Sequence, residues 1–234
     1  MGRRLSVGRR IDYSRVEAAV SARPHDLLWT QAQRCADDTP DWVVPILGRG
    51  GPFVVRRAVR MPGRLPVGVR GGCRRERFAM TIDSAQVADI CTPEQLSARI
   101  AQLAPARRRA IPALAVLGDM ARTLDRTGLC WGLGGAVGYE LATGEAVCHK
   151  ASDIDVLLRM PREIARADAR AVIDALAGLA VRCDIQMETP RGGVALADWA
   201  AGNTQVLVKS DQGPFLCPNP WSPAPLAADT ALVG

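Results

Sequence analysis

The stretch from Trp131 to Leu158 constrains the fold of this 234-residue chain more than any other. A short apolar run ends at Gly134-Gly135 and passes into a segment compatible with a helix. A second apolar run then begins with Asp153-Ile-Asp155. Glycines at a strand-to-helix turn let backbone N–H groups approach an anion, and the helix start adds its positive dipole end. The pattern predicts a phosphate-binding turn, although close packing of a helix on a strand would also use two glycines.

Asp153 and Asp155 are predicted to share one face of the second strand, because side chains alternate along a strand. Neighbouring carboxylates repel each other unless a cation lies between them, and Mg²⁺ typically takes one or two carboxylates together with substrate phosphates. We therefore interpret the pair as Mg²⁺ ligands rather than as a solvated acidic edge. Asp184 lies on the polar face of an alternating segment, 181–187, which could form a neighbouring strand.

Other motifs for phosphate or metal binding fit less well. A P-loop needs Gly-Lys-Ser/Thr, which does not occur in the sequence. A dinucleotide fingerprint would need glycine where Val137 stands, so a Rossmann interpretation rests only on Asp153 about twenty residues after the turn. Cys148 and His149 are adjacent but no second ligand pair has zinc spacing. The remaining pattern favours chemistry on a polyphosphate.

Composition narrows the possible partners and the location. The net charge is +6, and all but two of the 30 basic residues are arginines, which match phosphate and carboxylate geometry. The base composition of the gene could by itself produce this excess of arginine. Alternatively, the arginines could bind an acidic protein partner or a polyphosphate ligand. Aromatic residues make up only 4%, which disfavours nucleic acid. With no membrane-length apolar run, no signal peptide and seven scattered cysteines, the chain is predicted to be cytoplasmic, with no membrane contact and reduced thiols.

We expect an α+β fold with four segments. These are a flexible leader (1–20), a β-rich basic N-terminal domain (21–105), a catalytic domain (106–221) and a flexible tail (222–234). Thr92-Pro-Glu-Gln95 is typical of a helix start with a capping box. His25 beside Asp26 is interpreted as a structural hydrogen-bonded pair rather than a catalytic one. Short strands are expected at 42–44 and 53–55, and an edge strand at 65–72.

The order Gly-Gly, Asp-x-Asp and then a lone Asp resembles the nucleotidyltransferase superfamily of the DNA polymerase β kind. Further blocks extend the likeness over roughly residues 23–221. They are similar to the malonate decarboxylase holo-acyl-carrier-protein synthase family, the phosphoribosyl-dephospho-CoA transferases. The blocks are Arg-Pro-His-Asp-Leu-Leu-Trp (23–29), Pro-Val-Gly-Val-Arg-Gly (66–71), Glu-Arg-Phe-Ala (76–79), 131–158, Val-Leu-Val-Lys (206–209) and Pro-Asn-Pro-Trp (218–221).

The resemblance implies a nucleotidyltransferase-like mixed sheet with flanking helices, preceded by a smaller β-rich domain. It also implies an activity. The donor would be 2′-(5″-triphosphoribosyl)-3′-dephospho-CoA, the acceptor a serine of the malonate decarboxylase acyl carrier protein, and pyrophosphate would be released. Asp184 would be a third metal ligand or the general base. Residues implied to bind the donor are Gly134, Gly135, Lys150, Ser152, Arg70 and Arg77.

Two features of this sequence depart from the resemblance. Superfamily members commonly have serine where this chain has Gly135, and Asp184 is followed by Ile-Gln instead of Gly-Glu. Two alternatives therefore stay open: a nucleotidyltransferase acting on another small molecule or on RNA, and a non-catalytic nucleotide-binding module. The module would tolerate the loss of Asp155, whereas either enzyme would not.

Overall fold

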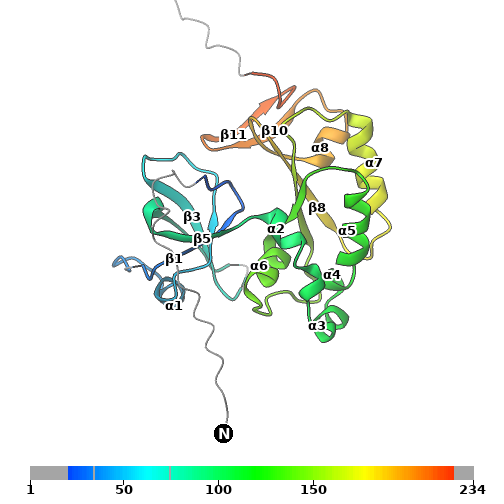
Figure 1. Ribbon diagram of the computed structural model, residues 1–234. Coiled ribbons are helices and arrows are strands. Elements are labelled where there is room, and N and C mark those ends of the chain that lie inside the picture. The colour runs from blue at the N-terminus through cyan, green and yellow to red at the C-terminus, as the bar shows by residue number, and fades with distance from the viewer. Residues whose placement is uncertain (1–20, 34, 74, 224–234) are drawn as a thin grey trace, which may run out of the picture.

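The computed structural model describes residues 21–33, 35–73 and 75–223, and these form two lobes, each built on its own β-sheet (Figure 1). The fold is α+β, as predicted. Arg74, the predicted leader and all but the first two residues of the predicted tail lie outside the described residues. Across the described chain, no helix combines the length and the apolar character needed to cross a membrane.

The N-terminal lobe is an antiparallel sheet of five strands in the order β4-β3-β2-β1-β5. Its core consists of apolar side chains from several strands, including the fully buried Leu28, Phe53 and Val67. One short helix, α1 (Val44–Gly48), packs beside it. The strands are β1 (Leu27–Thr30), β2 (Phe53–Val55), β3 (Arg64–Arg70), β4 (Arg77–Asp83) and β5 (Val87–Cys91), with a 3₁₀ turn at Ser84–Gln86.

Two local predictions in this lobe are wrong. The expected strand at 42–44 is a turn leading into α1, because Pro45 occupies a first-turn position where its fixed φ favours a helix. The expected edge strand at 65–72 is β3, which lies inside the sheet between β4 and β2. The edge strands are β4 and β5, and the arginine-rich start of β4 concealed that strand from sequence inspection. The predicted strand at 53–55 is confirmed as β2.

The C-terminal lobe is a mixed sheet of six strands in the order β11-β10-β9-β8-β7-β6. β7 and β8 run parallel, and the other neighbouring pairs in this sheet are antiparallel. The strands are β6 (Trp131–Leu133), β7 (Ile154–Arg159), β8 (Cys183–Thr189), β9 (Gly192–Ala195), β10 (Val206–Ser210) and β11 (Gly213–Cys217). The strand predicted at 181–187 is therefore β8, and it lies beside the strand that follows Asp153.

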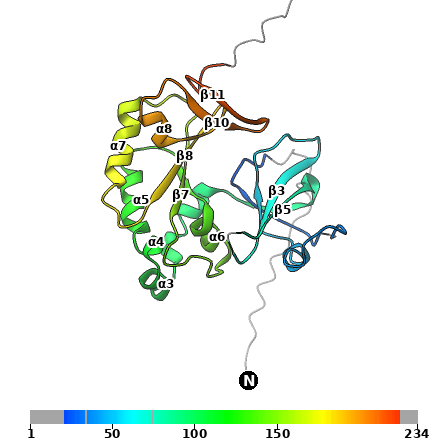
Figure 2. The ribbon, with the colours of Figure 1, turned by 180° about the vertical axis from the view of Figure 1, so that it is seen from behind.

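Helices cover both faces of this mixed sheet. α5 and α7 lie on the face turned away from the N-terminal lobe, and α2 and α6 lie toward it (Figures 1 and 2). The predicted capping box is confirmed, because Thr92 Oγ1 accepts from Gln95 N and the Gln95 side chain accepts from Thr92 N. The helices are α2 (Pro93–Ser97), α3 (Pro105–Ala110), α4 (Pro112–Ala115), α5 (Leu117–Asp125), α6 (Gly135–Thr143), α7 (Arg166–Leu176) and α8 (Leu196–Ala200), with a 3₁₀ turn at Ile100–Gln102.

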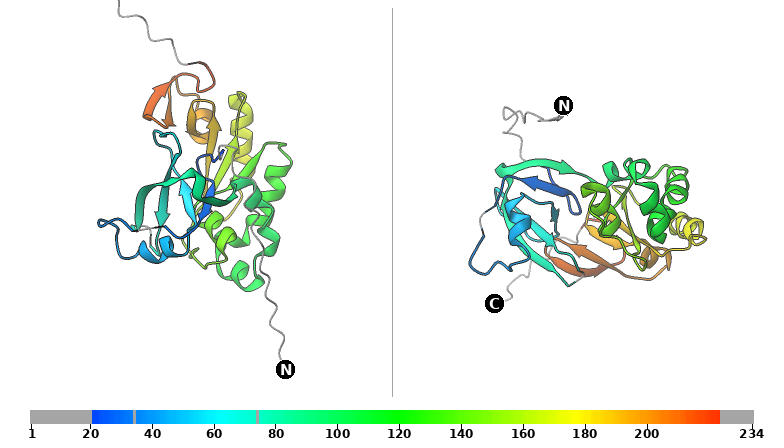
Figure 3. Two further views of the ribbon diagram at one scale, coloured as in Figure 1. Left: turned by 60° about the vertical axis from the view of Figure 1, so that its left-hand side comes forward. Right: turned by 90° about the horizontal axis from the view of Figure 1, so that it is seen from below.

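The two lobes join where β5 runs directly into α2. α2 packs so closely on β6 that a Cβ at Gly132 would lie 2.3 Å from the Pro93 carbonyl carbon. Charged groups add a second connection, since the Arg159 guanidinium, on the last residue of β7, reaches Asp26, Glu94 and Glu188. The lobes thus lie side by side and are linked at this junction by the chain and by ion pairs (Figure 3).

Candidate active site

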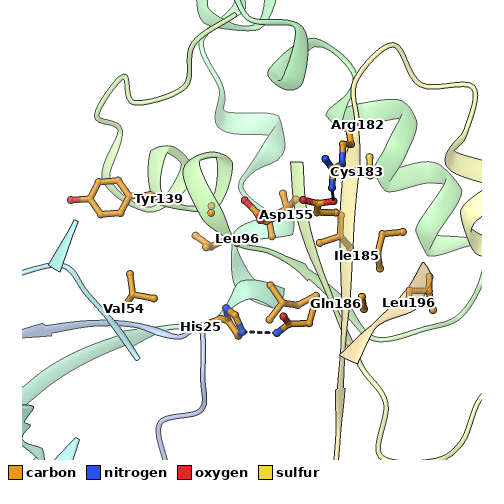
Figure 4. Close-up of a pocket in the computed structure, with 18 of the residues that line it drawn as sticks. His25, Val54, Leu96, Tyr139, Asp155, Arg182, Cys183, Ile185, Gln186 and Leu196 are labelled. Atoms are coloured by element: carbon orange, nitrogen blue, oxygen red, sulfur yellow. Dashed lines mark hydrogen bonds and ion pairs between the residues drawn. The ribbon is translucent and has the colours of Figure 1, made fainter. Parts of the chain in front are cut away.

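A cavity of about 1170 Å³ separates the two lobes, and both contribute to its walls. The N-terminal lobe supplies basic side chains from β3, from β4, from Arg56 directly after β2 and from His25 in the loop before β1. The C-terminal lobe supplies the glycine turn, the start of α6 and the polar face of β8 (Figure 4). Its polar and charged lining residues include His25, Arg56, Arg70, Arg77, Tyr139, Asp155, Arg182, Asp184, Gln186 and Lys209. A concave site between lobes that gathers both signs of charge is typical of a ligand-binding cleft.

Asp155 and Asp184 lie side by side on neighbouring strands in one wall of this cavity. The parallel register of β7 and β8 pairs these two residues directly. Burial raises the pKa of Asp155, and the negative charges of Asp153 and Asp184 raise it further, while His25 and Arg70 act in the opposite direction. The described residues around these carboxylates therefore do not fully compensate their negative charge. Such a cluster is favourable for a cation.

The donor set fits Mg²⁺ held by few protein ligands. Among the described residues, no group of three or more His, Cys, Asp or Glu side chains is arranged to hold a metal ion. The Asp184 carboxylate accepts a hydrogen bond of 2.6 Å from Arg182 Nη2 instead. Asp153 immediately precedes β7, so it shares a face with Asp155. Mg²⁺ commonly needs only one or two carboxylates when phosphates and waters complete its shell. The arrangement fits a metal that arrives with its phosphate ligand.

Gly135 lets the Asp155 carboxylate lie against the start of α6. Its φ is +56°, and a Cβ there would lie 1.6 Å from Asp155 Oδ2. A serine at this position would collide with that oxygen, which explains the departure from the superfamily pattern. Gly134 N–H already donates to the Asp155 carbonyl oxygen at 2.9 Å. The N–H groups that follow it in the first turn of α6 lack an intrahelical acceptor and suit an anion.

The other predicted donor-binding residues fall into two groups. Arg70 and Arg77 line the cavity, and the Arg70 guanidinium lies 5.8 Å from the centre of the Tyr139 ring. Lys150 and Ser152 are not among the lining residues. Ser152 is buried, and its Oγ accepts from His149 N at 3.0 Å, while Lys150 is exposed. The structure therefore brings the arginines to the cavity and gives Ser152 a place in the turn before Asp153.

Several polar residues of the cavity were not predicted as site residues, among them His25, Tyr139 and Gln186. The interpretation of His25 and Asp26 as a hydrogen-bonded pair is wrong. Asp26 accepts from Arg23 N at 2.8 Å, whereas the His25 ring is hydrogen-bonded to the Gln186 side chain at 2.9 Å. The alternation along β8 did place Gln186 on the same face as Asp184. No local sequence signal connects either residue to His25.

Glu188 continues this polar face toward the junction of the lobes. Burial by itself raises the pKa of Glu188, but hydrogen bonds from His25 and Arg57 and the charges of both more than offset it, so its pKa falls to about 2. The Arg57 guanidinium forms an ion pair with the Glu188 carboxylate, and Arg159 Nη1 lies 3.9 Å from it. Glu188 is therefore charged at neutral pH and anchors the junction of the lobes through these ion pairs.

Comparison with known proteins decides the family. Two family profiles match in sequence order: the Phosphoribosyl-dephospho-CoA transferase MdcG N-terminal domain over residues 23–93 and the corresponding C-terminal domain over residues 95–220. The chain belongs to the phosphoribosyl-dephospho-CoA transferase family. It is therefore a transferase, and the resemblance predicted from the sequence blocks is confirmed. The boundary between the two profiles coincides with the passage from β5 into α2.

Individual relatives in this family cover nearly the whole chain. The phosphoribosyl-dephospho-CoA transferase of Pseudomonas aeruginosa is 41% identical over 206 residues, which is 88% of this chain and 96% of the relative. The Pseudomonas putida enzyme is 42% identical over 201 residues (86% and 95%), and that of Azotobacter vinelandii 41% over 210 residues (88% and 97%). No solved structure gives a significant match.

Proposed function

We propose that this protein transfers the phosphoribosyl-dephospho-CoA group from 2′-(5″-triphosphoribosyl)-3′-dephospho-CoA to a serine of the malonate decarboxylase acyl carrier protein. The relatives are named for that transferred group. The observation that supports the proposal most is the direct pairing of Asp155 with Asp184 in a cavity whose opposite wall carries Arg70 and Arg77. Carboxylates facing arginines across a cleft suit a metal-assisted reaction of a polyphosphate.

In this proposal the serine oxygen attacks the α-phosphorus of the triphosphate. The bond between that phosphorus and the oxygen leading to the β-phosphorus breaks, and pyrophosphate leaves. Asp153 and Asp155 would hold Mg²⁺, which supplies positive charge that neutralises the reacting phosphates. Arg70, Arg77 and the first turn of α6 would bind the phosphates from the opposite side and fix their orientation.

Asp184 would accept the proton of the serine hydroxyl. Its Oδ1 is bound by Arg182, and its Oδ2 makes no hydrogen bond within the described residues. The side chain is 46% exposed, so a carrier serine can reach it. A positioned base typically contributes about 10²–10⁴-fold to the rate. The predicted cytoplasmic location and the absence of a nucleic-acid partner are consistent with this substrate but remain predictions.

The decisive experiment incubates the protein with the triphosphoribosyl donor, Mg²⁺ and the apo carrier, and then weighs the carrier by mass spectrometry. We expect a mass gain equal to the phosphoribosyl-dephospho-CoA group and one pyrophosphate released per carrier. A carrier whose acceptor serine is replaced by alanine should gain nothing. An unchanged carrier mass at saturating donor would refute the proposal.

The same assay tests Asp184 with a single-turnover measurement. Asp184→Asn should slow transfer by about 10²–10⁴-fold while donor binding persists. The matched variant Arg182→Ala removes the ion pair but keeps the carboxylate, so it should retain most of the rate. Full-speed transfer by Asp184→Asn would remove the proposed role as base, and lost donor binding would make Asp184 a metal ligand.

A further inference from the structure

His25 has a backbone conformation that only a few residue types adopt readily. It is the one non-glycine residue in the described chain with a positive φ, at +75°. Hydrogen bonds hold it there: His25 N donates to Val55 O at 3.0 Å, and Val55 N donates to Asp26 O at 2.9 Å. The left-handed conformation is strained for an L-residue, and such strain is concentrated at functional sites. In this conformation the ring enters the cavity from the N-terminal lobe (Figure 4).

The neighbours of the His25 ring determine which nitrogen carries a proton. Gln186 Nε2 lies 2.8 Å from Glu188 Oε1 and 2.9 Å from His25 Nε2. The carboxylate accepts one amide hydrogen, so the amide nitrogen faces Glu188 and its second hydrogen points at His25 Nε2. A neutral ring then accepts at Nε2 and carries its proton on Nδ1. A charged ring would donate from Nε2 to Glu188, 3.5 Å away, and would still carry a proton on Nδ1.

Nδ1–H is therefore a hydrogen-bond donor in either protonation state. It has no acceptor among the described residues, and the His25 side chain is 34% exposed, so a ligand can reach it. Gln186 follows Asp184 by two residues on the polar face of β8, a step of about 7 Å along a strand. His25, which is hydrogen-bonded to Gln186, therefore lies near Asp184 and its register partner Asp155, one of the two carboxylates proposed to hold the metal. An oxygen-rich, negatively charged chain held at Asp155 would extend to His25.

We propose that His25 is a substrate-binding residue that donates its Nδ1 hydrogen to a non-bridging oxygen of a polyphosphate chain, with Gln186 and Glu188 fixing the ring. The inference rests on the proposed function for the kind of ligand. It goes beyond that function by assigning His25, which has no role in it, a direct contact with the phosphates. A purely structural His25 would instead serve only to connect β8 to the loop before β1.

The test uses inorganic triphosphate with Mg²⁺ as the probe and observes the imidazole rings by ¹⁵N-resolved NMR. The chain has two histidines, so two sets of ring signals are expected. His149 is an internal control, because it lies outside the cavity and its Nδ1 already accepts from Ala151 N at 3.2 Å. Triphosphate should shift the His25 Nδ1 signal and leave that of His149 in place. A His25 signal unmoved at saturating triphosphate would overturn the proposal.

Two variants separate the ring donor from the backbone conformation. Asparagine and glycine both tolerate a positive φ, and the asparagine amide offers a donor near the position of Nδ1. His25→Asn should bind triphosphate within a few-fold of the parent by calorimetry, whereas His25→Gly should bind about 10- to 100-fold more weakly, the range for a hydrogen bond to a charged group. Equal affinity of both variants and the parent would refute the contact, as would failure of the parent to bind.

The outcome is distinguishable from failure of the proposed function. A shift of His25 by triphosphate without any mass gain of the carrier would keep the phosphate contact and reject the proposed acceptor. Transfer to the carrier at full rate by His25→Gly would keep the proposed function and reject the contact.

Discussion

Glu188 should contribute more to folding stability than any exposed acidic residue of this chain. Its carboxylate is 10% exposed and contacts His25, Arg57 and Arg159. Its pKa falls from 4.5 to about 2 in the folded protein. Each pKa unit corresponds to about 1.4 kcal/mol, so the charged carboxylate stabilises the fold by about 3 kcal/mol at neutral pH. Glu188→Gln should remove about that amount, which agrees with the 3–5 kcal/mol range for breaking a buried ion pair.

The pH dependence has a definite sign. Because the pKa in the folded state lies below that of the unfolded chain, the stabilisation is fully present above pH 4.5 and is lost as the pH falls through about 2. By pH 3 roughly half of it should be gone. The difference in unfolding free energy between the parent and Glu188→Gln should therefore be nearly constant from pH 7 to 5 and shrink to about half by pH 3.

Urea unfolding followed by tryptophan fluorescence measures this difference at each pH. Asp119→Asn is the matched control, because Asp119 also pairs with an arginine, Arg122, but both side chains are more than 60% exposed. That exposed pair should be worth at most about 1 kcal/mol. If Glu188→Gln were as stable as the control at pH 7, or if its deficit were the same at pH 3 as at pH 7, the assignment of Glu188 as a charged anchor would be wrong.

Three further predictions concern the cavity. Asp153→Asn and Asp155→Asn should each abolish transfer, while stability should hold or rise because each change relieves repulsion between carboxylates. The carrier assay measures transfer and chemical denaturation measures stability. Near-normal turnover by either variant would contradict the prediction. Arg70→Ala should weaken donor binding and reduce its salt dependence, whereas Arg75→Ala, outside the cavity lining, should not; equal effects in a salt titration would contradict docking by Arg70. Gly135→Ala should slow transfer by about tenfold or more, because the added Cβ displaces the Asp155 carboxylate. Gly144 also has a positive φ but has open space around it, so Gly144→Ala should leave the transfer rate unchanged in the same assay.

The sequence predicted those parts of the site that depend on neighbours within a few residues. Gly134-Gly135 required a turn, and strand alternation placed Asp155 relative to Asp153 and Asp184 relative to Gln186. Both arguments use only backbone geometry, so they do not depend on the tertiary fold. The pairing of β8 with β7 needed the resemblance to the superfamily as well, because alternation alone does not select a neighbouring strand.

Local propensity misled where tertiary packing or a fixed φ decided the outcome. Val43 and Val44 are β-branched and favour a strand, yet Pro45 begins a helix and Val43 is fully buried beside it. The arginine-rich segment before Phe78 carries no strand pattern, although β4, which begins at Arg77, pairs with β3 along the whole length of both strands. The composition of a segment indicates which secondary structure it can form, whereas the order of strands in a sheet depends on residues elsewhere in the chain.

The role of His25 lay beyond any local argument, because its partner Gln186 is 161 residues away. Asp26 offered a plausible neighbour in sequence, but the turn that gives His25 its positive φ directs the two side chains to different partners, Asp26 toward Arg23 and Arg159 and His25 toward β8. The polar face of β8 then runs from the proposed base, Asp184, through Gln186 to Glu188 at the lobe junction. One strand thus carries both the proposed base and the anchor for the other lobe. A disturbance at the anchor should therefore change ligand binding as well as stability, which makes Glu188→Gln a test of the site and not only of the fold.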